Sequence, residues 1–186
     1  MFQLVTARLV LRDMIADDWQ LIHALSTEPL VTHYQSWLRL PTVQAAHKWV
    51  TDVRYHNALD ARLSYNLTML DQATHQRLGW IGWGRASGLD ATTYDFGYAL
   101  LPPFWRHGYM TEAVQAMLAF TFQTVGATTI TGECAADNHA SASVMEKAGL
   151  RLVAQWDELN ETTGAAEAQL RYALTAQEWH EMQQHP

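Results

Sequence analysis

The spacing of apolar residues changes abruptly between residues 94 and 118. Apolar side chains first recur at every second position, as in a half-buried β-strand: Tyr94, Phe96, Tyr98 and Leu100. Pro102 and Pro103 end this strand, because proline cannot donate to a β-ladder. Apolar residues then recur at intervals of three and four, on one face of a helix: Met110, Ala113, Val114, Met117 and Leu118. This change of period predicts a strand, a short loop and an amphipathic helix.

Similar patterns cover the rest of the chain without an internal repeat or linker. Further strands are predicted at residues 8–13, 63–69, 78–85, 127–134, 151–158 and 166–174. Further helices are predicted at residues 16–25, 42–59, 138–148 and 175–183. Thr42 and Asn138 are expected to cap helix starts, Gly126 and Gly149 to end helices, and residues 160–164 to form the last hairpin turn. This order of elements indicates an α/β or α+β fold with a mixed sheet.

Length and charge limit the classes of function. A chain of 186 residues is enough for one full core, so we expect residues 1–186 to form a single domain. Lys+Arg 12 and Asp+Glu 19 give a net charge of −7, which disfavours nucleic acid and anionic membranes as partners. Charged residues interrupt residues 1–18, which therefore predict neither a signal peptide nor a spanning helix. The cytoplasm is the expected location.

The chain has one cysteine, Cys134, which excludes an intramolecular disulfide and a multi-cysteine metal site. We interpret Cys134 as a buried thiol rather than a nucleophile. His180, Glu181 and His185 approach a zinc-protease motif, but histidines five residues apart do not share a helix face. No metal is therefore predicted.

The loop before the helix at 110–118 is the strongest candidate for a binding site. Helix starts leave unpaired backbone N–H groups, and Gly108 allows a ligand to approach them closely. Arg106 and His107 add positively charged or polar donors in an otherwise acidic chain. A phosphate cradle and an ordinary helix start explain these residues equally well. The loop is not a P-loop, because no Lys-Ser or Lys-Thr follows the glycine.

Three segments together resemble the GNAT superfamily of N-acetyltransferases, and within it the ribosomal-protein alanine acetyltransferases (RimJ/RimL-like). They are residues 6–12 (TARLVLR), residues 105–113 (WRHGYMTEA) and residues 138–150, which begin NHAS and end EKAGL. The resemblance implies a mixed, mostly antiparallel sheet of six to seven strands, splayed between the fourth and fifth and flanked by helices. Against the family's loop pattern, Gln/Arg-x-x-Gly-x-Gly/Ala, Gly108 is kept while Trp105 and Met110 depart.

The resemblance also implies acetyl-CoA as cosubstrate. The loop residues Arg106, His107, Gly108, Tyr109, Met110 and Thr111 would bind its pyrophosphate through their backbone amides. Pantetheine would lie between the strands at 95–101 and 128–134, beside Leu100 and Leu101. A backbone N–H near Leu100 would polarise the thioester carbonyl. Asn138 and Ser141 would contact the pantetheine arm.

Proton transfer is less well defined by the sequence. Many relatives place a tyrosine acid seven residues after the asparagine, but this chain has Met145 there. Ser141 or water therefore becomes the candidate acid for the departing thiolate. Asp95 and Glu133 are the candidate bases, and polar side chains on a solvated sheet face explain them as well.

The acceptor is expected to be an amine that attacks acetyl-CoA directly in a ternary complex. A ribosomal or other protein N-terminus is the first expectation from the resemblance, and a small amine is the second. Tyr34, Trp37 and Trp49 are candidates for the wall of the acceptor pocket, because aromatic faces hold cations. A catalytically silent acyl-CoA-binding module is the alternative function. The sequence is compatible with a monomer or a homodimer.

Overall fold

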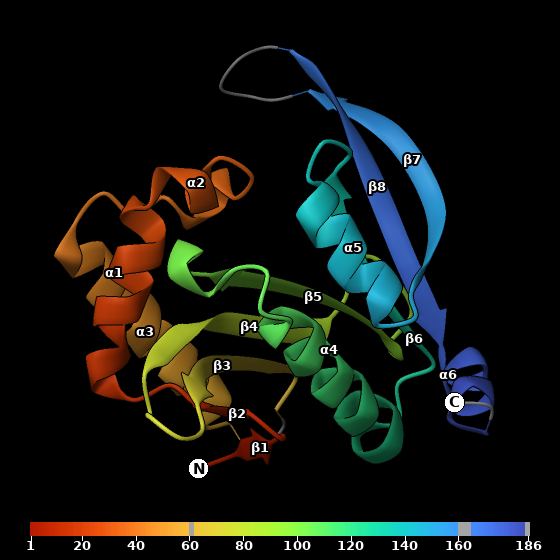
Figure 1. Ribbon diagram of the computed structural model, residues 1–186, viewed down its shortest axis with the longest axis horizontal. Coiled ribbons are helices and arrows are strands. Elements are labelled where there is room, and N and C mark those ends of the chain that lie inside the picture. Colours follow the sequence, from red (N-terminus) through yellow and green to blue (C-terminus); the bar gives the residue numbers. More distant parts are fainter. Residues whose placement is uncertain (60–61, 160–164, 185–186) are drawn as a thin grey trace.

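The computed structural model describes residues 1–59, 62–159 and 165–184. Within these residues, eight strands form one sheet in the order β1-β2-β3-β4-β5-β6-β8-β7 (Figure 1). The strands are β1 (Gln3–Val5), β2 (Leu9–Asp13), β3 (Ser64–Asp71), β4 (Arg77–Arg85), β5 (Thr93–Leu100), β6 (Thr129–Ala135), β7 (Arg151–Leu159) and β8 (Ala166–Thr175). The α-helices are α1 (Trp19–Thr27), α2 (Pro29–Thr32), α3 (Val43–Asn57), α4 (Tyr109–Phe120), α5 (His139–Lys147) and α6 (Ala176–Gln184).

The predicted mixed, mostly antiparallel sheet flanked by helices is confirmed, but the predicted number of six to seven strands is wrong. The additional strand is β1, which pairs antiparallel with β2 from Gln3↔Arg12 to Val5↔Val10. Three residues are too few to show a period of two, so the pattern of apolar residues does not reveal this strand. The predicted turn at 160–164 lies outside the described residues.

The predicted helix ends follow from local hydrogen bonds. The side chain of Thr42 accepts from the backbone N–H of Ala45 at 3.1 Å, and Asn138 Oδ1 accepts from the N–H of Ser141 at 3.1 Å. Gly149 has a φ of 99°, the left-handed conformation that ends a helix at low cost. These caps fix where α3 and α5 begin and where α5 ends.

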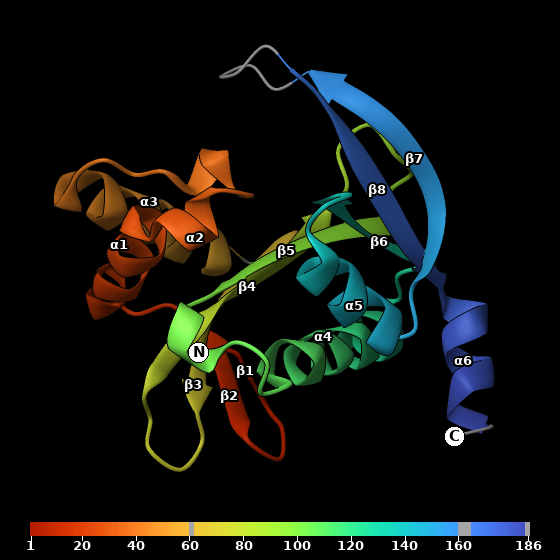
Figure 2. The same cartoon turned by 45° about the horizontal axis from the view of Figure 1, so that its top comes forward.

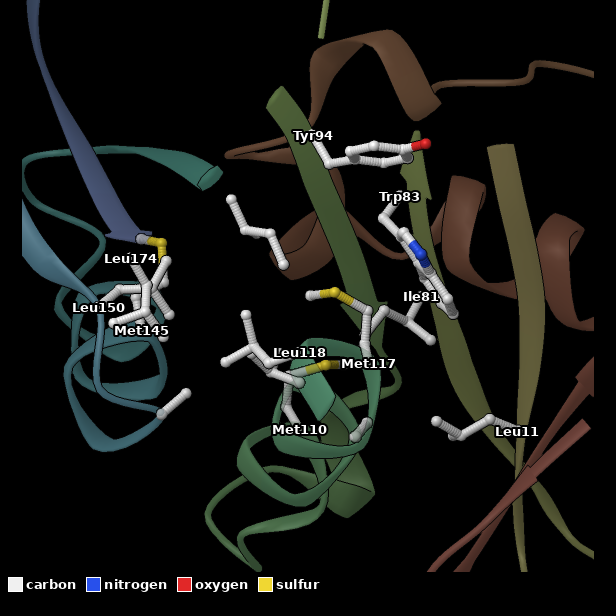
Figure 3. Close-up of a cluster of buried hydrophobic side chains, with 14 of the residues drawn as sticks. Leu11, Ile81, Trp83, Tyr94, Met110, Met117, Leu118, Met145, Leu150 and Leu174 are labelled. Atoms are coloured by element: carbon white, nitrogen blue, oxygen red, sulfur yellow. The ribbon is translucent and has the colours of Figure 1, made fainter. Parts of the chain in front are cut away.

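Helices cover both faces of the sheet. The apolar face of α4 packs on one face, where Met110, Met117 and Leu118 lie near Ile81 and Trp83 of β4 (Figure 3). Helices α1 and α3 cover the other face, with a separate core that includes Leu21, Ile22, Leu25, Val50 and Trp80. Among the residues that the structure describes, no helix is both long enough and apolar enough to cross a membrane.

The sheet divides between β5 and β6, which form its parallel pair. Their pairing runs from Thr93↔Thr129 to Phe96↔Gly132 and then stops, although both strands continue. Beyond this point β6, β8 and β7 turn away from β4 and β5 (Figure 2). The predicted splay is therefore confirmed, and its strands are fifth and sixth in the chain because β1 precedes the predicted first strand.

Candidate active site

The backbone of β5 leaves hydrogen-bonding groups facing the gap to β6. The N–H of Leu101 donates to the carbonyl of Leu78 at 3.0 Å, which sets the alternation along the antiparallel β4–β5 pair. By this alternation, the backbone groups of Tyr98 and Leu100 point away from β4. Their N–H groups thus face the gap, where an extended ligand can accept hydrogen bonds from them.

The β5 backbone carbonyls that face this gap already accept hydrogen bonds from side chains of the protein. The Leu100 carbonyl accepts a hydrogen bond from Trp105 Nε1 at 2.6 Å. The Tyr98 carbonyl accepts one from Gln35 Nε2. The β5 side of the gap therefore offers mainly donors to a ligand.

The predicted cofactor loop lies at the end of β5 and opens α4. Arg106 has a φ of 65° and Gly108 a φ of 79°. Two residues in the left-handed conformation therefore flank His107. Such alternation turns successive N–H groups toward one concavity, which suits an anion. The first backbone hydrogen bond of α4 runs from the Glu112 N–H to the Gly108 carbonyl. The N–H groups before Glu112 therefore have no partner within the helix and point toward the same concavity.

The two departures from the family's loop pattern have local explanations. The side chain of Met110 is 5 % exposed and packs into the core below the loop, so only its backbone is available to a ligand. Trp105 folds back on the end of β5 through its bond to Leu100. Neither side chain fills the concavity at Gly108, so the residues present fit a bound diphosphate.

The two motifs at residues 6–12 and 105–113 meet in a clamp formed by Thr6, Arg8 and Glu112. Glu112 Oε1 accepts from Thr6 Oγ1 at 2.6 Å and from the Arg8 N–H at 2.9 Å, while Oε2 pairs with Arg8 Nε at 2.7 Å. Arg8 Nη1 also donates to the His107 carbonyl at 2.9 Å. Burial opposes ionisation of Glu112, but these donors lower the pKa of its carboxyl. The clamp thus ties the loop to the first long strand.

A cavity of about 470 Å³ lies beside the gap, on the sheet face that also carries α1 and α3. Six of the predicted site residues line it: Tyr34, Trp37, Asp95, Glu133, Asn138 and Ser141. Trp49 does not, because its ring packs edge-on against Trp80 with centroids 5.8 Å apart, and Trp80 is the residue that reaches the cavity. A second space of about 40 Å³ joins Gln35 and Gly97 to Tyr98, Ser141 and Met145. Gln35, Gly97 and Ser141 line both spaces, so the smaller one adjoins the cavity.

The two predicted bases differ in their surroundings. Glu133 is paired with Arg171, whose Nη2 lies 2.6 Å from Glu133 Oε1. Burial, and then the neighbouring Glu133 charge, raise the pKa of Asp95. A carboxyl whose pKa is raised takes up a proton more readily than an ordinary aspartate, as a general base must.

Ser141 is hydrogen-bonded to a buried tyrosine. The Tyr98 hydroxyl lies 2.8 Å from Ser141 Oγ and 3.3 Å from the Ser141 carbonyl. Burial raises the pKa of the Tyr98 phenol, with the hydrogen bond to Ser141 acting in the opposite direction. Cys134 is buried beside them, as predicted, and burial raises the pKa of its thiol too. Tyr98 and Ser141 therefore stay protonated and can donate into the gap.

Sequence reasoning did not find four residues of this region: Gln35, Trp80, Tyr98 and Arg171. Tyr98 belongs to the alternating strand, which marks it as inward-facing and gives no sign of its hydroxyl partner. Gln35 meets β5 across 63 residues. Contacts across such separations have no local signal.

Comparisons with known proteins agree with this geometry. Residues 8–151 match the family model described as "Acetyltransferase (GNAT) domain". An Aspergillus fumigatus protein named FsC-acetyl coenzyme A-N(2)-transacetylase is 33 % identical over 91 residues, 48 % of this chain and only 39 % of that protein's length. The crystal structure of a GNAT-family acetyltransferase from Bacillus anthracis has a TM-score of 0.82 at 22 % identity, covering 95 % of this chain and 99 % of that one. RimL, a ribosomal L7/L12 alpha-N-protein acetyltransferase solved with coenzyme A, has a TM-score of 0.81 at 17 % identity, covering 92 % and 96 %.

Proposed function

Since this chain belongs to the acetyltransferase (GNAT) domain family, we propose that it transfers an acetyl group from acetyl-CoA to a primary amine in a ternary complex. The observation that carries the proposal is the end of β5–β6 pairing at Phe96↔Gly132, beside the amide concavity at Gly108. A strand-like gap next to an anion cradle is what a thioester arm carrying a diphosphate needs.

Acetyl-CoA supplies an activated acyl group as a thioester. The amides of residues 106–111 would hold its diphosphate at the N-terminus of α4, where the helix dipole favours negative charge. The N–H groups of Tyr98 and Leu100 would hold the arm along β5. The Leu100 N–H would also polarise the thioester carbonyl, as an oxyanion donor does.

The cavity beside the gap would hold the acceptor amine. Its aromatic walls at Tyr34, Trp37 and Trp80 and its carboxylates at Asp95 and Glu133 suit a cationic ammonium group. Of the two carboxylates, Asp95 is the better base, because Arg171 neutralises Glu133. Asp95 would remove a proton from the ammonium group, directly or through water.

The Tyr98–Ser141 pair would protonate the departing thiolate. Tyr98 can donate to Ser141 Oγ. The Ser141 hydroxyl also hydrogen-bonds the Cys134 thiol, so its hydrogen would turn from Cys134 to the departing sulfur. In the balanced reaction, a C–N bond forms and the C–S bond breaks. An ammonium ion and acetyl-CoA give an N-acetyl amide, coenzyme A thiol and one proton, which leaves through the base.

The acceptor belongs to one of two classes. RimL is named for a protein α-amine and the Aspergillus relative for an N(2) group, which supports a protein N-terminus first and a small amine second. The cytoplasmic location and the monomeric or homodimeric state stay predictions.

Thiol release tests the proposal directly. The purified chain is incubated with acetyl-CoA and a panel of amines, including peptides with free N-termini, amino acids, amino sugars and polyamines. We expect free thiol to appear only when a suitable amine is present, with one N-acetyl product per thiol. Tight acetyl-CoA binding without thiol release across the panel would support the silent acyl-CoA-binding module instead.

The proposed base predicts a pH profile. Because the pKa of Asp95 is raised above its ordinary value of 3.8, the acid limb attributable to this carboxyl should lie above that value. Activity should rise with pH as Asp95 ionises. Asp95→Asn should lower kcat/KM for the amine and remove this limb, leaving the limb of the amine itself. An unchanged profile would exclude Asp95 as the base.

A further inference from the structure

Gln35 connects the acceptor cavity to the gap between β5 and β6. Its side chain lines both the cavity of about 470 Å³ and the smaller space of about 40 Å³. Gln35 Nε2 donates to the backbone carbonyl of Tyr98 at the edge of the gap. This bond orients the amide, so the direction of Oε1 is set as well.

The other end of the amide has a different environment. Gln35 Oε1 is shielded from solvent and has no hydrogen-bond partner among the described residues. A carbonyl oxygen removed from water without a donor destabilises the fold. A ligand that brings an N–H to this oxygen would satisfy it.

Its neighbours are also hydrogen-bond acceptors. Asp95 and Glu133 line the same cavity, and Glu133 shares the smaller space with Gln35. Because Arg171 pairs with Glu133, the acceptors left for a ligand are Gln35 Oε1 and the Asp95 carboxylate, which are together complementary to a group with several N–H donors. A protonated primary amine carries three such donors on one nitrogen.

The segment that carries Gln35 is held in place from several directions. The Gln35 carbonyl accepts from the N–H of buried Leu38 at 2.9 Å. The hydroxyl of Tyr34 donates to the Asp137 carbonyl at 3.4 Å, and Trp37 packs edge-on against Trp80 with centroids 5.7 Å apart. Gln35 is therefore positioned before any ligand binds.

We propose that Gln35 Oε1 accepts a hydrogen bond from the N–H of the acceptor amine and directs its nitrogen into the gap. The proposal rests on the proposed acetyl transfer and adds a residue that orients the amine. As Asp95 removes one proton, Gln35 keeps a second N–H engaged. The nitrogen lone pair then points toward the thioester held along β5.

Gln35→Met tests the proposal, because methionine keeps the length of the side chain and removes both polar ends. We expect kcat/KM for the amine to fall by about 10- to 100-fold, while the dissociation constant of coenzyme A, measured by calorimetry, stays at the wild-type value. Ser36→Ala is the matched control, since Ser36 is exposed on the same segment. The control should keep the wild-type kcat/KM. A Gln35→Met variant with wild-type kinetics would overturn the proposal.

Gln35→Glu separates binding of the amine from support of Tyr98. The ionised carboxylate keeps acceptor oxygens but cannot donate to the Tyr98 carbonyl. If Oε1 binds the amine, the KM for the amine should stay within a few-fold of wild type in Gln35→Glu and rise in Gln35→Met. Equal losses in both variants would show a structural role and overturn the proposal.

Failure of the underlying function gives a different result. If the wild-type chain releases no thiol with any amine, acetyl transfer fails and the role of Gln35 falls with it. If the wild type is active and Gln35→Met is equally active, only the role of Gln35 is wrong.

Discussion

The two edges of β5 behave differently. Toward β4, pairing is continuous from Arg85↔Tyr94 to Gly79↔Leu100. Toward β6, it stops at Phe96↔Gly132, and the rest of the strand faces a gap. The same strand thus serves as a closed element of the sheet on one side and as an open binding surface on the other.

Side chains hold the open half apart. A Cβ on Gly132 would lie 2.8 Å from both the Phe96 ring and the Met145 sulfur, so these groups already press against β6 at the last paired position. Beyond it, Tyr98 and Ser141 occupy the space beside the gap. Side-chain packing therefore separates the two strands, and the backbone donors of β5 stay unpaired where this packing prevents pairing.

The largest change in kcat is expected when the tyrosines in the two halves of β5 are compared. Tyr98 lies in the open half and Tyr94 in the paired half, on the same face of the strand. If Tyr98 supports the leaving-group acid, Tyr98→Phe should lower kcat by about 100-fold or more, with coenzyme A affinity unchanged. Tyr94→Phe should leave kcat near the wild-type value. Equal kcat values in the two variants would remove Tyr98 from the chemistry.

The same tyrosine should not limit activity at high pH. Burial raises the pKa of Tyr98 above its ordinary value of 10, so the phenol stays protonated throughout the range in which most enzymes are assayed. We therefore expect no loss of kcat from Tyr98 up to pH 10. A decline in kcat that begins below pH 10 and disappears in Tyr98→Phe would contradict this assignment.

A smaller effect is expected at the anion cradle. Gly108 and Gly126 have φ values of 79° and 78°, so alanine at either position should cost about 1 kcal/mol of unfolding free energy through backbone strain. Only Gly108 adjoins the proposed diphosphate site. Gly108→Ala should weaken coenzyme A binding by about 10-fold, and Gly126→Ala should not. Calorimetry that finds equal affinities would place the diphosphate elsewhere.

The smallest effect is expected from the clamp behind this loop. Because the pKa of Glu112 lies below its ordinary value of 4.5, its ionised form stabilises the fold above that pH. This contribution is lost as the pH falls through the folded-state value. Glu112→Gln should cost up to about 1 kcal/mol at neutral pH, since the pair with Arg8 is partly exposed. The difference in unfolding free energy should vanish in acid, and a difference that persists there would exclude the ion pair as its source.

Much of the fold could be predicted because its signals are local. The alternation from Tyr94 to Leu100 and the helical face from Met110 to Leu118 identified β5 and α4 without tertiary information. Strand β1 and the four-residue helix α2 were missed, because each is too short for its pattern of apolar residues to repeat.

The candidate site could be predicted only in part. The loop at 106–111 could be proposed from the sequence because its residues are contiguous, and its role stays a prediction. Tyr34 and Trp37 line the cavity, whereas Trp49 lies behind Trp80, because an aromatic residue on a helix does not indicate which neighbour will cover it. The bond from Gln35 to Tyr98 joins residues 63 positions apart, and only the folded chain brings them together.

A crystal structure with coenzyme A bound would test both halves of the proposed cofactor site at once. We expect the diphosphate on the amides at the start of α4 and the pantetheine arm between β5 and β6, accepting hydrogen bonds from the N–H groups of Tyr98 or Leu100. Strands that pair along their full length past Gly132, with coenzyme A bound elsewhere on the molecule, would contradict this expectation.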